Sequence, residues 1–373
     1  MTLRFAPLIA LALATSSLVS CGSPGPVEEP PLSEEALAAV SKDPGAPTKA
    51  LARAADELFT LDGLGETRAL VVYHGGKLAL ERYAPGYDKD TRFVSWSMAK
   101  TVTAVMIGML VADGQLRLDA PAPVPRWQRT GDPRAEITLR HLLQMRSGLE
   151  HTEAGDPPWE SGEVRMLFLD GRDDMADYAT AQPLEAEPGE KFEYSSNTTV
   201  ILAAIAARAL TDSKDPDVRR KAVADYLKAR LFEPLGMTSA VPEFDRAGTL
   251  IGGSLIHATA RDWARLGEVM RTGNAVDGTP IISPEWREFM LTPAPNNPEY
   301  GGQIWLNRAG GAYDRPTLFP GSGPETVFSF VGHLGQYVVV SPEQRLTVVR
   351  LGNTPDTDRR AVVDRLGRFF AAG

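Results

Sequence analysis

Ser97 and Lys100 are the first residues whose types and spacing could do chemistry together, in the segment Ser-Met-Ala-Lys at 97–100. Residues three apart share one face of a helix, so the lysine amine can reach the serine hydroxyl. A serine hydroxyl is a weak nucleophile that needs a base. A neutral lysine can be that base, because burial and the positive end of a helix dipole both lower its pKa. The spacing therefore predicts a nucleophile and its base.

The residues that follow favour this interpretation over a capped helix with a surface lysine. The segment 102–110 is apolar on nearly all sides, which is typical of a buried helix. Lys100, on the first turn of that helix, should then lie near the interior. In the same turn, the backbone N–H of Ser97 would point toward a developing oxyanion.

Two later segments could complete such a site. Tyr194, in Phe-Glu-Tyr-Ser-Ser-Asn at 192–197, could relay a proton if it lies beside the lysine; alternatively it only packs where a loop meets a helix. The segment Gly-His-Leu-Gly-Gln-Tyr at 332–337 lies among strands, where glycines permit close approach of a ligand. An N–H there could complete an oxyanion hole with Ser97, or the segment is a β-bulge in which His333 merely packs.

The elements that must position these residues are strands at both ends of the chain and helices between them. A hairpin is predicted over 69–83 and a strand meander near the C-terminus, so the sheet should be antiparallel. The sequence thus predicts an α/β fold, with a sheet built from both chain ends, flanked by helices, and a mid-chain helical lobe. The predicted helices are 97–113, 137–145, 164–181 with a break at 170–171, 196–210, 219–232, 258–272 and 359–370; the late strands are 302–307, 326–331, 336–340 and 346–351.

The N-terminus predicts export. An apolar run over 5–19 follows Arg4, is too short to span a bilayer and resembles a signal-peptide core, so residues 1–20 are predicted to be a signal peptide. Cys21 follows Leu-Val-Ser as in a bacterial lipobox, which implies lipidation of its thiol and attachment to a membrane; the alternative is an ordinary signal peptide with a stray cysteine. We expect a periplasmic, outer-membrane or cell-surface location. The Pro- and Glu-rich residues 21–50 are predicted to be a flexible tether.

The composition excludes several classes of site. The chain has 373 residues and a formal net charge of -9, so nucleic acid is not an expected partner. With Cys21 as the single cysteine, no internal disulfide or cysteine-based metal site can form. The five histidines have no His-x-x-x-His spacing, and we predict neither a metal nor a cofactor. A Ser-His-Asp hydrolase is disfavoured because no Gly-x-Ser-x-Gly segment is present.

Taken in order, the three segments resemble the penicillin-recognising serine hydrolases: class C β-lactamases, D-alanyl-D-alanine carboxypeptidases and related esterases. Segments 165–168, 174–178 and 335–336 are similar to the aminohexanoate-dimer hydrolase branch. The resemblance covers most of 55–355 and implies a β-lactamase-like domain over 51–373, with an α/β lobe at 51–115 and 247–373 and a helical lobe at 116–246. It further implies that Ser97 is acylated, Lys100 is its base partner and Tyr194 is the proton shuttle.

Two departures from that family affect the expected substrate. Ser196 stands where class C β-lactamases have Asn, and the Lys-Thr-Gly segment has no clear match, because His-Leu-Gly at 333–335 lies in its place. The oxyanion donor beside Ser97 is either His333 or Gln336, of which we favour His333; Gly335 and Ser196 complete the expected substrate-binding set.

Without the Lys-Thr-Gly lysine we expect hydrolysis of small esters or linear amides. An arginine such as Arg172 or Arg261 could replace that lysine. The alternatives are a carboxypeptidase or β-lactamase acting on cell-wall peptides or β-lactams, and a catalytically inactive binding protein of the cell envelope. The sequence does not predict the oligomeric state.

Overall fold

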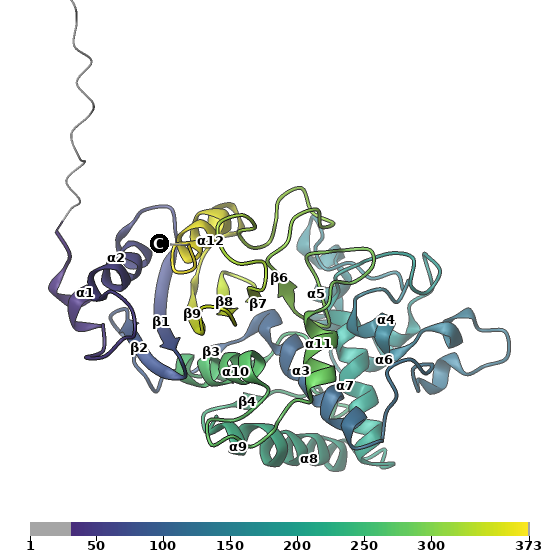
Figure 1. Cartoon of the computed structure of the whole chain (residues 1–373). Coiled ribbons are helices and arrows are strands. Elements are labelled where there is room, and N and C mark those ends of the chain that lie inside the picture. Colours follow the sequence, from purple (N-terminus) through teal and green to yellow (C-terminus); the bar gives the residue numbers. More distant parts are fainter. Residues whose placement is uncertain (1–30, 372–373) are drawn as a thin grey trace, which may run out of the picture. The chain divides into compact units, whose positions relative to one another are not determined.

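A six-stranded antiparallel sheet organises the part of the chain that this computed structural model describes, residues 31–371. The strand order is β2-β1-β9-β8-β7-β6 (Figure 1). The strands are β1 Glu66–His74, β2 Lys77–Tyr83, β6 Trp305–Leu306, β7 Phe328–Gly332, β8 Gln336–Ser341 and β9 Leu346–Asn353. Because β1 pairs with β9, the sheet is built from both ends of the chain, which confirms the predicted fold class.

Both faces of this sheet are covered by helices. Neighbouring residues of β1 belong to two separate hydrophobic cores, with Val71 in one and Val72 in the other. Helix α10 (Ala260–Thr272) covers the first face, and α2 (Thr48–Thr60) and α12 (Arg359–Gly367) cover the second (Figure 1). Burial on both faces explains why the central strands are continuous apolar runs.

The remaining helices form a cluster beside the sheet. Its centre is the buried pair α3 and α7, and a short sheet of β3 (Phe93–Val94), β5 (Ile256–Ala258) and β4 (Val241–Pro242) adjoins it. The helices are α3 Ala99–Ala112, α4 Leu139–Leu143, α5 Gly162–Phe168, α6 Met175–Ala181, α7 Ser196–Leu210, α8 Pro216–Leu227, the π-helix Lys228–Phe232, α9 Glu233–Leu235 and α11 Pro284–Leu291. Single 3-10 turns lie at Trp96–Met98, Pro125–Trp127, Pro133–Glu136, Pro158–Glu160 and Asp356–Asp358.

The predicted tether over 21–50 is wrong for its second half. Helix α1 (Glu34–Ala38) begins at a cap in which Ser33 accepts a hydrogen bond from the backbone of Ala36, and α2 begins at Thr48. Val40 forms a β-bridge with Leu80, and Ala36 is fully buried. The composition of this segment is typical of a tether because it is dominated by Pro and Glu. A five-residue helix such as α1 contains too few apolar residues to change that composition.

The predicted signal peptide and the lipidation residue Cys21 lie outside the described residues, so both stay predictions. From Leu32 onward the chain forms one compact unit, and the lobe boundaries at 115 and 246 also stay predictions. None of the helices within residues 31–371 has the length and apolar character needed to cross a membrane.

Candidate active site

Ser97 is held by a tight turn at the start of α3. The 3-10 turn Trp96–Met98 leads directly into that helix, and Trp96 adopts a φ of 45°. A left-handed backbone costs a non-glycine residue about 1–3 kcal/mol, so the surrounding structure must impose it. Ser95 does so in part, because its backbone N–H donates to Ile256 and its hydroxyl accepts from the Ile256 N–H. Ser97 itself remains partly exposed.

Lys100 lies one turn later with its amine at the centre of a polar cluster. The side chain is 1% exposed, and Nζ is 2.9 Å from Ser97 Oγ, 2.7 Å from Ser196 Oγ and 2.9 Å from the Gly253 carbonyl. Burial lowers the pKa of Lys100, against the opposing effect of nearby carboxylates. Ser97 and Lys100, three residues apart, therefore meet as their helical spacing predicts.

Tyr194 lies against the same amine. Its ring centre is 4.8 Å from Lys100 Nζ, and its phenol is near enough to Ser97 for that side chain to act on its pKa. Ser195 caps α7 by accepting from Thr198, which fixes the preceding Tyr194 at the helix entrance. Burial raises the pKa of Tyr194 well above its usual value, so the phenol stays protonated and available as a donor. Trp305 supports the ring, with centroids 5.4 Å apart.

Two carboxylates that the sequence analysis did not single out complete the cluster. Glu153 accepts from the backbone N–H of Ser196 at 2.5 Å and lies 2.6 Å from its hydroxyl, while Glu163 lies 3.1 Å from that hydroxyl. Glu153 Oε1 is also 3.7 Å from Lys100 Nζ. Ser196 is fully buried, so its hydroxyl serves Lys100 and the two carboxylates rather than an incoming substrate. No spacing pattern links Glu153 and Glu163 to Lys100 in the sequence.

The third predicted segment also reaches the site. The His333 ring makes an edge contact with Trp96, with centroids 5.3 Å apart, at the turn between β7 and β8. Gly332 ends β7 so close to the 3-10 turn that a Cβ there would be 2.4 Å from the Ser95 carbonyl oxygen. Only glycine allows this approach, which places the start of the β7–β8 turn beside the nucleophile.

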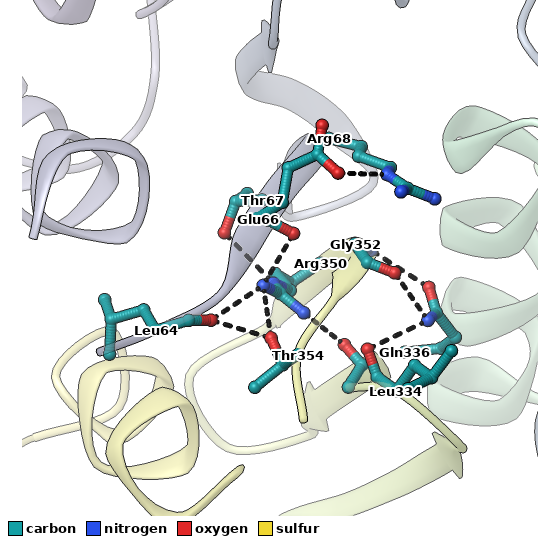
Figure 2. A network of polar contacts seen from close by, with 10 residues as sticks. Leu64, Glu66, Thr67, Arg68, Leu334, Gln336, Arg350, Gly352 and Thr354 are labelled. Atoms are coloured by element: carbon teal, nitrogen blue, oxygen red, sulfur yellow. Dashed lines mark hydrogen bonds and ion pairs between the residues drawn. The ribbon is translucent and has the colours of Figure 1, made fainter. Parts of the chain in front are cut away.

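Gln336 is directed into the sheet (Figure 2). Its Nε2 donates to the carbonyls of His333, Leu334 and Gly352 at 2.8–3.1 Å, and its Oε1 accepts from the Gly352 N–H. The side chain is therefore engaged in holding the turn and is not free to bind a substrate. Which backbone N–H completes the oxyanion hole stays a prediction, with His333 as the favoured residue.

Arg350 secures the same turn from the other side (Figure 2). This fully buried guanidinium donates to the Gly335 carbonyl at 2.8 Å, to Thr354 Oγ1 at 2.8 Å and to the Glu66 carbonyl at 3.0 Å. Gly335 adopts a φ of 79°, and a Cβ there would lie 2.6 Å from Arg350 Nη1. The expected substrate-binding residue Gly335 thus has a backbone role in shaping the turn.

The structure also locates the two arginines considered as replacements for the missing lysine. Arg261 pairs with Glu81 on β2, and Arg172 has a side chain that is 66% exposed, near Asp173. Among residues 31–371, no group of three or more His, Cys, Asp or Glu side chains is placed to hold a metal ion.

Comparison with known proteins gives consistent results. A family model described as Beta-lactamase matches residues 66–372. The 6-aminohexanoate-dimer hydrolase of Paenarthrobacter ureafaciens is 27% identical over 339 residues, covering 87% of this chain and 83% of that protein. An esterase of Burkholderia gladioli is 31% identical over 172 residues, covering 42% of this chain and 41% of that protein. The structure of a family VIII carboxylesterase superposes with a TM-score of 0.62 at 17% identity, covering 87% of this chain and 97% of that one.

Proposed function

We propose, from the premise that this chain belongs to the β-lactamase family, that it hydrolyses small esters or linear amides through an acyl-enzyme on Ser97. The observation that carries the proposal is the buried amine of Lys100, 2.9 Å from Ser97 Oγ. A desolvated lysine with a lowered pKa is a suitable general base for a serine. The family includes esterases and amidases, and the relatives described above are named as a hydrolase of a 6-aminohexanoate dimer and as an esterase.

In the proposed reaction Ser97 Oγ attacks the carbonyl carbon while Lys100 Nζ takes the hydroxyl proton. The resulting oxyanion is bound by the backbone N–H of Ser97 and by a second N–H from the turn that starts at His333. Tyr194 donates its proton to the leaving alcohol or amine as the bond to the carbonyl carbon breaks, and it regains a proton from Lys100. Water then attacks the acyl-enzyme by the same route and releases the acid.

The substrate preference rests on charge. β-Lactams carry a carboxylate that is costly to bury without a cation, and the Lys-Thr-Gly lysine that would meet it is absent. Arg261, one candidate substitute, is paired with Glu81. Esters need no such cation and have better leaving groups than amides. Linear amides are included because of the likeness to a hydrolase of an aminohexanoate dimer.

A covalent fluorophosphonate probe tests the nucleophile. We expect one adduct on the wild-type protein, located on Ser97 by peptide mass spectrometry, and none on Ser97→Ala. If the wild type turns over esters but carries no adduct on Ser97, the proposed mechanism is wrong. A fully inert wild type would favour an inactive envelope binding protein.

Comparison of kcat/KM for a p-nitrophenyl acyl ester with that for a chromogenic cephalosporin tests the substrate class. We expect the ester value to be higher. A cephalosporin value equal to or above it would favour the β-lactamase alternative, and release of D-alanine from a cell-wall peptide would favour the carboxypeptidase.

We further propose that the protein is exported and attached to a membrane through a lipid on Cys21. This proposal rests on the short apolar run and the Leu-Val-Ser-Cys segment that ends it. Mass spectrometry of the mature N-terminus is the test. An unmodified N-terminus at another residue would overturn it.

A further inference from the structure

The hydroxyl of Ser196 has more neighbours than one hydrogen can serve. Lys100 Nζ lies 2.7 Å away, Glu153 Oε1 2.6 Å and Glu163 Oε1 3.1 Å. A hydroxyl donates one hydrogen and accepts two. Because lysine hydrogens point outward as donors, Ser196 accepts from Lys100 and can donate to one carboxylate only. The contact with the other carboxylate therefore requires a proton on that carboxyl group.

The geometry identifies which carboxyl group holds that proton. Glu153 already accepts from the backbone N–H of Ser196 at 2.5 Å and lies nearer to the hydroxyl, so it is the carboxyl group placed to accept the Ser196 hydrogen. Glu163 is left to donate to Ser196. In agreement, burial and then the charge of Glu153 raise the pKa of Glu163 to about 7, despite the opposing charge of Lys100.

Counting the donors and acceptors around neutral Lys100 in the same way gives the direction of its lone pair. A neutral amine has two hydrogens and one lone pair. The Gly253 carbonyl, 2.9 Å away, can only accept. Ser196 also accepts, because its own hydrogen is directed to Glu153. Both amine hydrogens are then committed, and the lone pair is directed at Ser97, as a general base requires.

We propose that Glu153 and Glu163 are positioning residues for Lys100: through Ser196 they direct its lone pair at Ser97, and the proton on Glu163 controls the negative charge beside it. This inference rests on the proposed acyl-enzyme function. As pH rises, Glu163 loses its proton and adds a second negative charge near the amine. That charge stabilises the ammonium form and opposes the loss of the proton from Lys100.

Five other ionisable groups, which lie near this cluster or near the residues it contacts, keep one charge state between about pH 5 and 9. These groups are His151, Tyr194, Tyr300, Tyr313 and Arg359. Burial lowers the pKa of His151, two residues before Glu153, to about 4. Burial also raises the pKa values of the three tyrosines, and Arg359 stays charged. Within the cluster, Glu163 and Lys100 are thus the groups whose titration should shape the pH–rate profile, and because His333 contacts Trp96 beside Ser97, the comparison of Glu163→Gln with the wild type is what isolates the carboxyl contribution.

The test is the pH dependence of two rates, fluorophosphonate labelling of Ser97 and kcat/KM for an acyl ester. In Glu163→Gln the second negative charge cannot form, so the ascending limb should move to lower pH by roughly one unit or more and become steeper. The matched control Glu160→Gln removes an exposed carboxylate from the same stretch of chain and should leave the profile unchanged. Thermal unfolding verifies that each variant is folded, and Glu163→Ala replaces Glu163→Gln if the latter is not.

A merely structural role for Glu163 would lower both rates by one factor at every pH, and that result would overturn the inference. Ser196→Ala keeps both carboxyl groups but removes the acceptor, so kcat should fall about tenfold or more with KM unchanged. An unchanged kcat would equally overturn it. If wild-type Ser97 is not labelled at any pH, the proposed function fails and this inference with it. Labelling with superimposed wild-type and Glu163→Gln profiles removes this inference alone.

Discussion

Lys100 Nζ lies closer to Ser196 Oγ, at 2.7 Å, than to Ser97 Oγ, at 2.9 Å. The amine is therefore anchored by the first residue of α7 while it faces the nucleophile at the start of α3. Two helix N-termini meet at one lysine, and their positive ends add to burial in disfavouring the ammonium form. The acid–base properties of the site depend on this junction as much as on the Ser97–Lys100 spacing.

Tyr194→Phe should lower kcat for an acyl ester by about 10²-fold or more, because the variant loses the hydroxyl that protonates the leaving group. Steady-state kinetics on a series of leaving groups measures this loss, which should grow as the leaving group becomes more basic. Tyr300→Phe is the matched control. The Tyr300 ring packs against Tyr194, and its hydroxyl has no hydrogen-bond partner in the described part of the chain. Equal losses in both variants would contradict the role of Tyr194.

Gly332→Ala should reduce kcat/KM by at least about tenfold, because the new Cβ would push the end of β7 away from Ser95 and disturb the turn that holds Ser97. Gly267→Ala is the control. On α10 its Cβ would lie 2.7 Å from Thr347 on the sheet, so it should lower the unfolding free energy by about 1–3 kcal/mol with little change in rate. A Gly332→Ala enzyme with wild-type kinetics would show that the approach of β7 is not needed.

Gln336→Leu should lower the unfolding free energy by about 1–3 kcal/mol, because buried carbonyls of the β7–β8 turn and the Gly352 N–H lose their partners. Urea unfolding measures the change. Gln128→Leu, at an exposed glutamine, should change stability by less than about 0.5 kcal/mol. If Gln336→Leu lowers the rate without lowering stability, the side chain contacts substrate after all.

Glu163 should contribute a fall in the unfolding free energy of the wild type as pH rises from about 4.5 to about 7, against an opposite contribution from His151, whose lowered pKa makes the folded protein bind fewer protons than the unfolded chain below about pH 6.5. The pKa of Glu163 is raised in the folded protein to about 7 from a reference value of 4.5. Across that window the folded state binds the proton and the unfolded state does not, so the unfolding free energy falls with pH. In Glu163→Gln this contribution is absent, so across the same window the unfolding free energy of the variant should fall less with pH than that of the wild type, or rise. Urea unfolding at several pH values makes the comparison, and parallel slopes would show that Glu163 titrates normally.

Much of the scaffold follows from local pattern. The predicted helix 196–210 coincides with α7, because Ser195 is a strong cap and the run that follows is apolar. The Ser97–Lys100 contact follows from helical spacing alone. By contrast, the strand predicted over 302–307 is reduced to Trp305–Leu306, since the tight turn around Gln303, with a φ of 62°, interrupts it.

The carboxylates of the site could not be predicted in this way. Glu153 lies in a loop, and Glu163 lies in the first turn of the short helix α5, where an acidic residue is expected simply to favour the helix N-terminus. Their approach to Ser196 depends on how α5 packs against α7, which no local pattern encodes. Likewise, the Gln336 side chain points into the sheet and not toward a substrate, because β9 supplies the Gly352 carbonyl to which it donates.

The pairing of β1 with β9 determines when this protein can acquire its structure during synthesis. Arg350 on β9 donates to Thr67 on β1, a residue 283 positions earlier in the chain. The two strands are hydrogen-bonded to each other, so neither has its partner until both have been synthesised. The sheet therefore cannot close until nearly the whole polypeptide has left the ribosome. Such long-range closure makes folding slow. Under the export proposed above, this delay would be an advantage, because the nascent chain could not complete its fold before translocation.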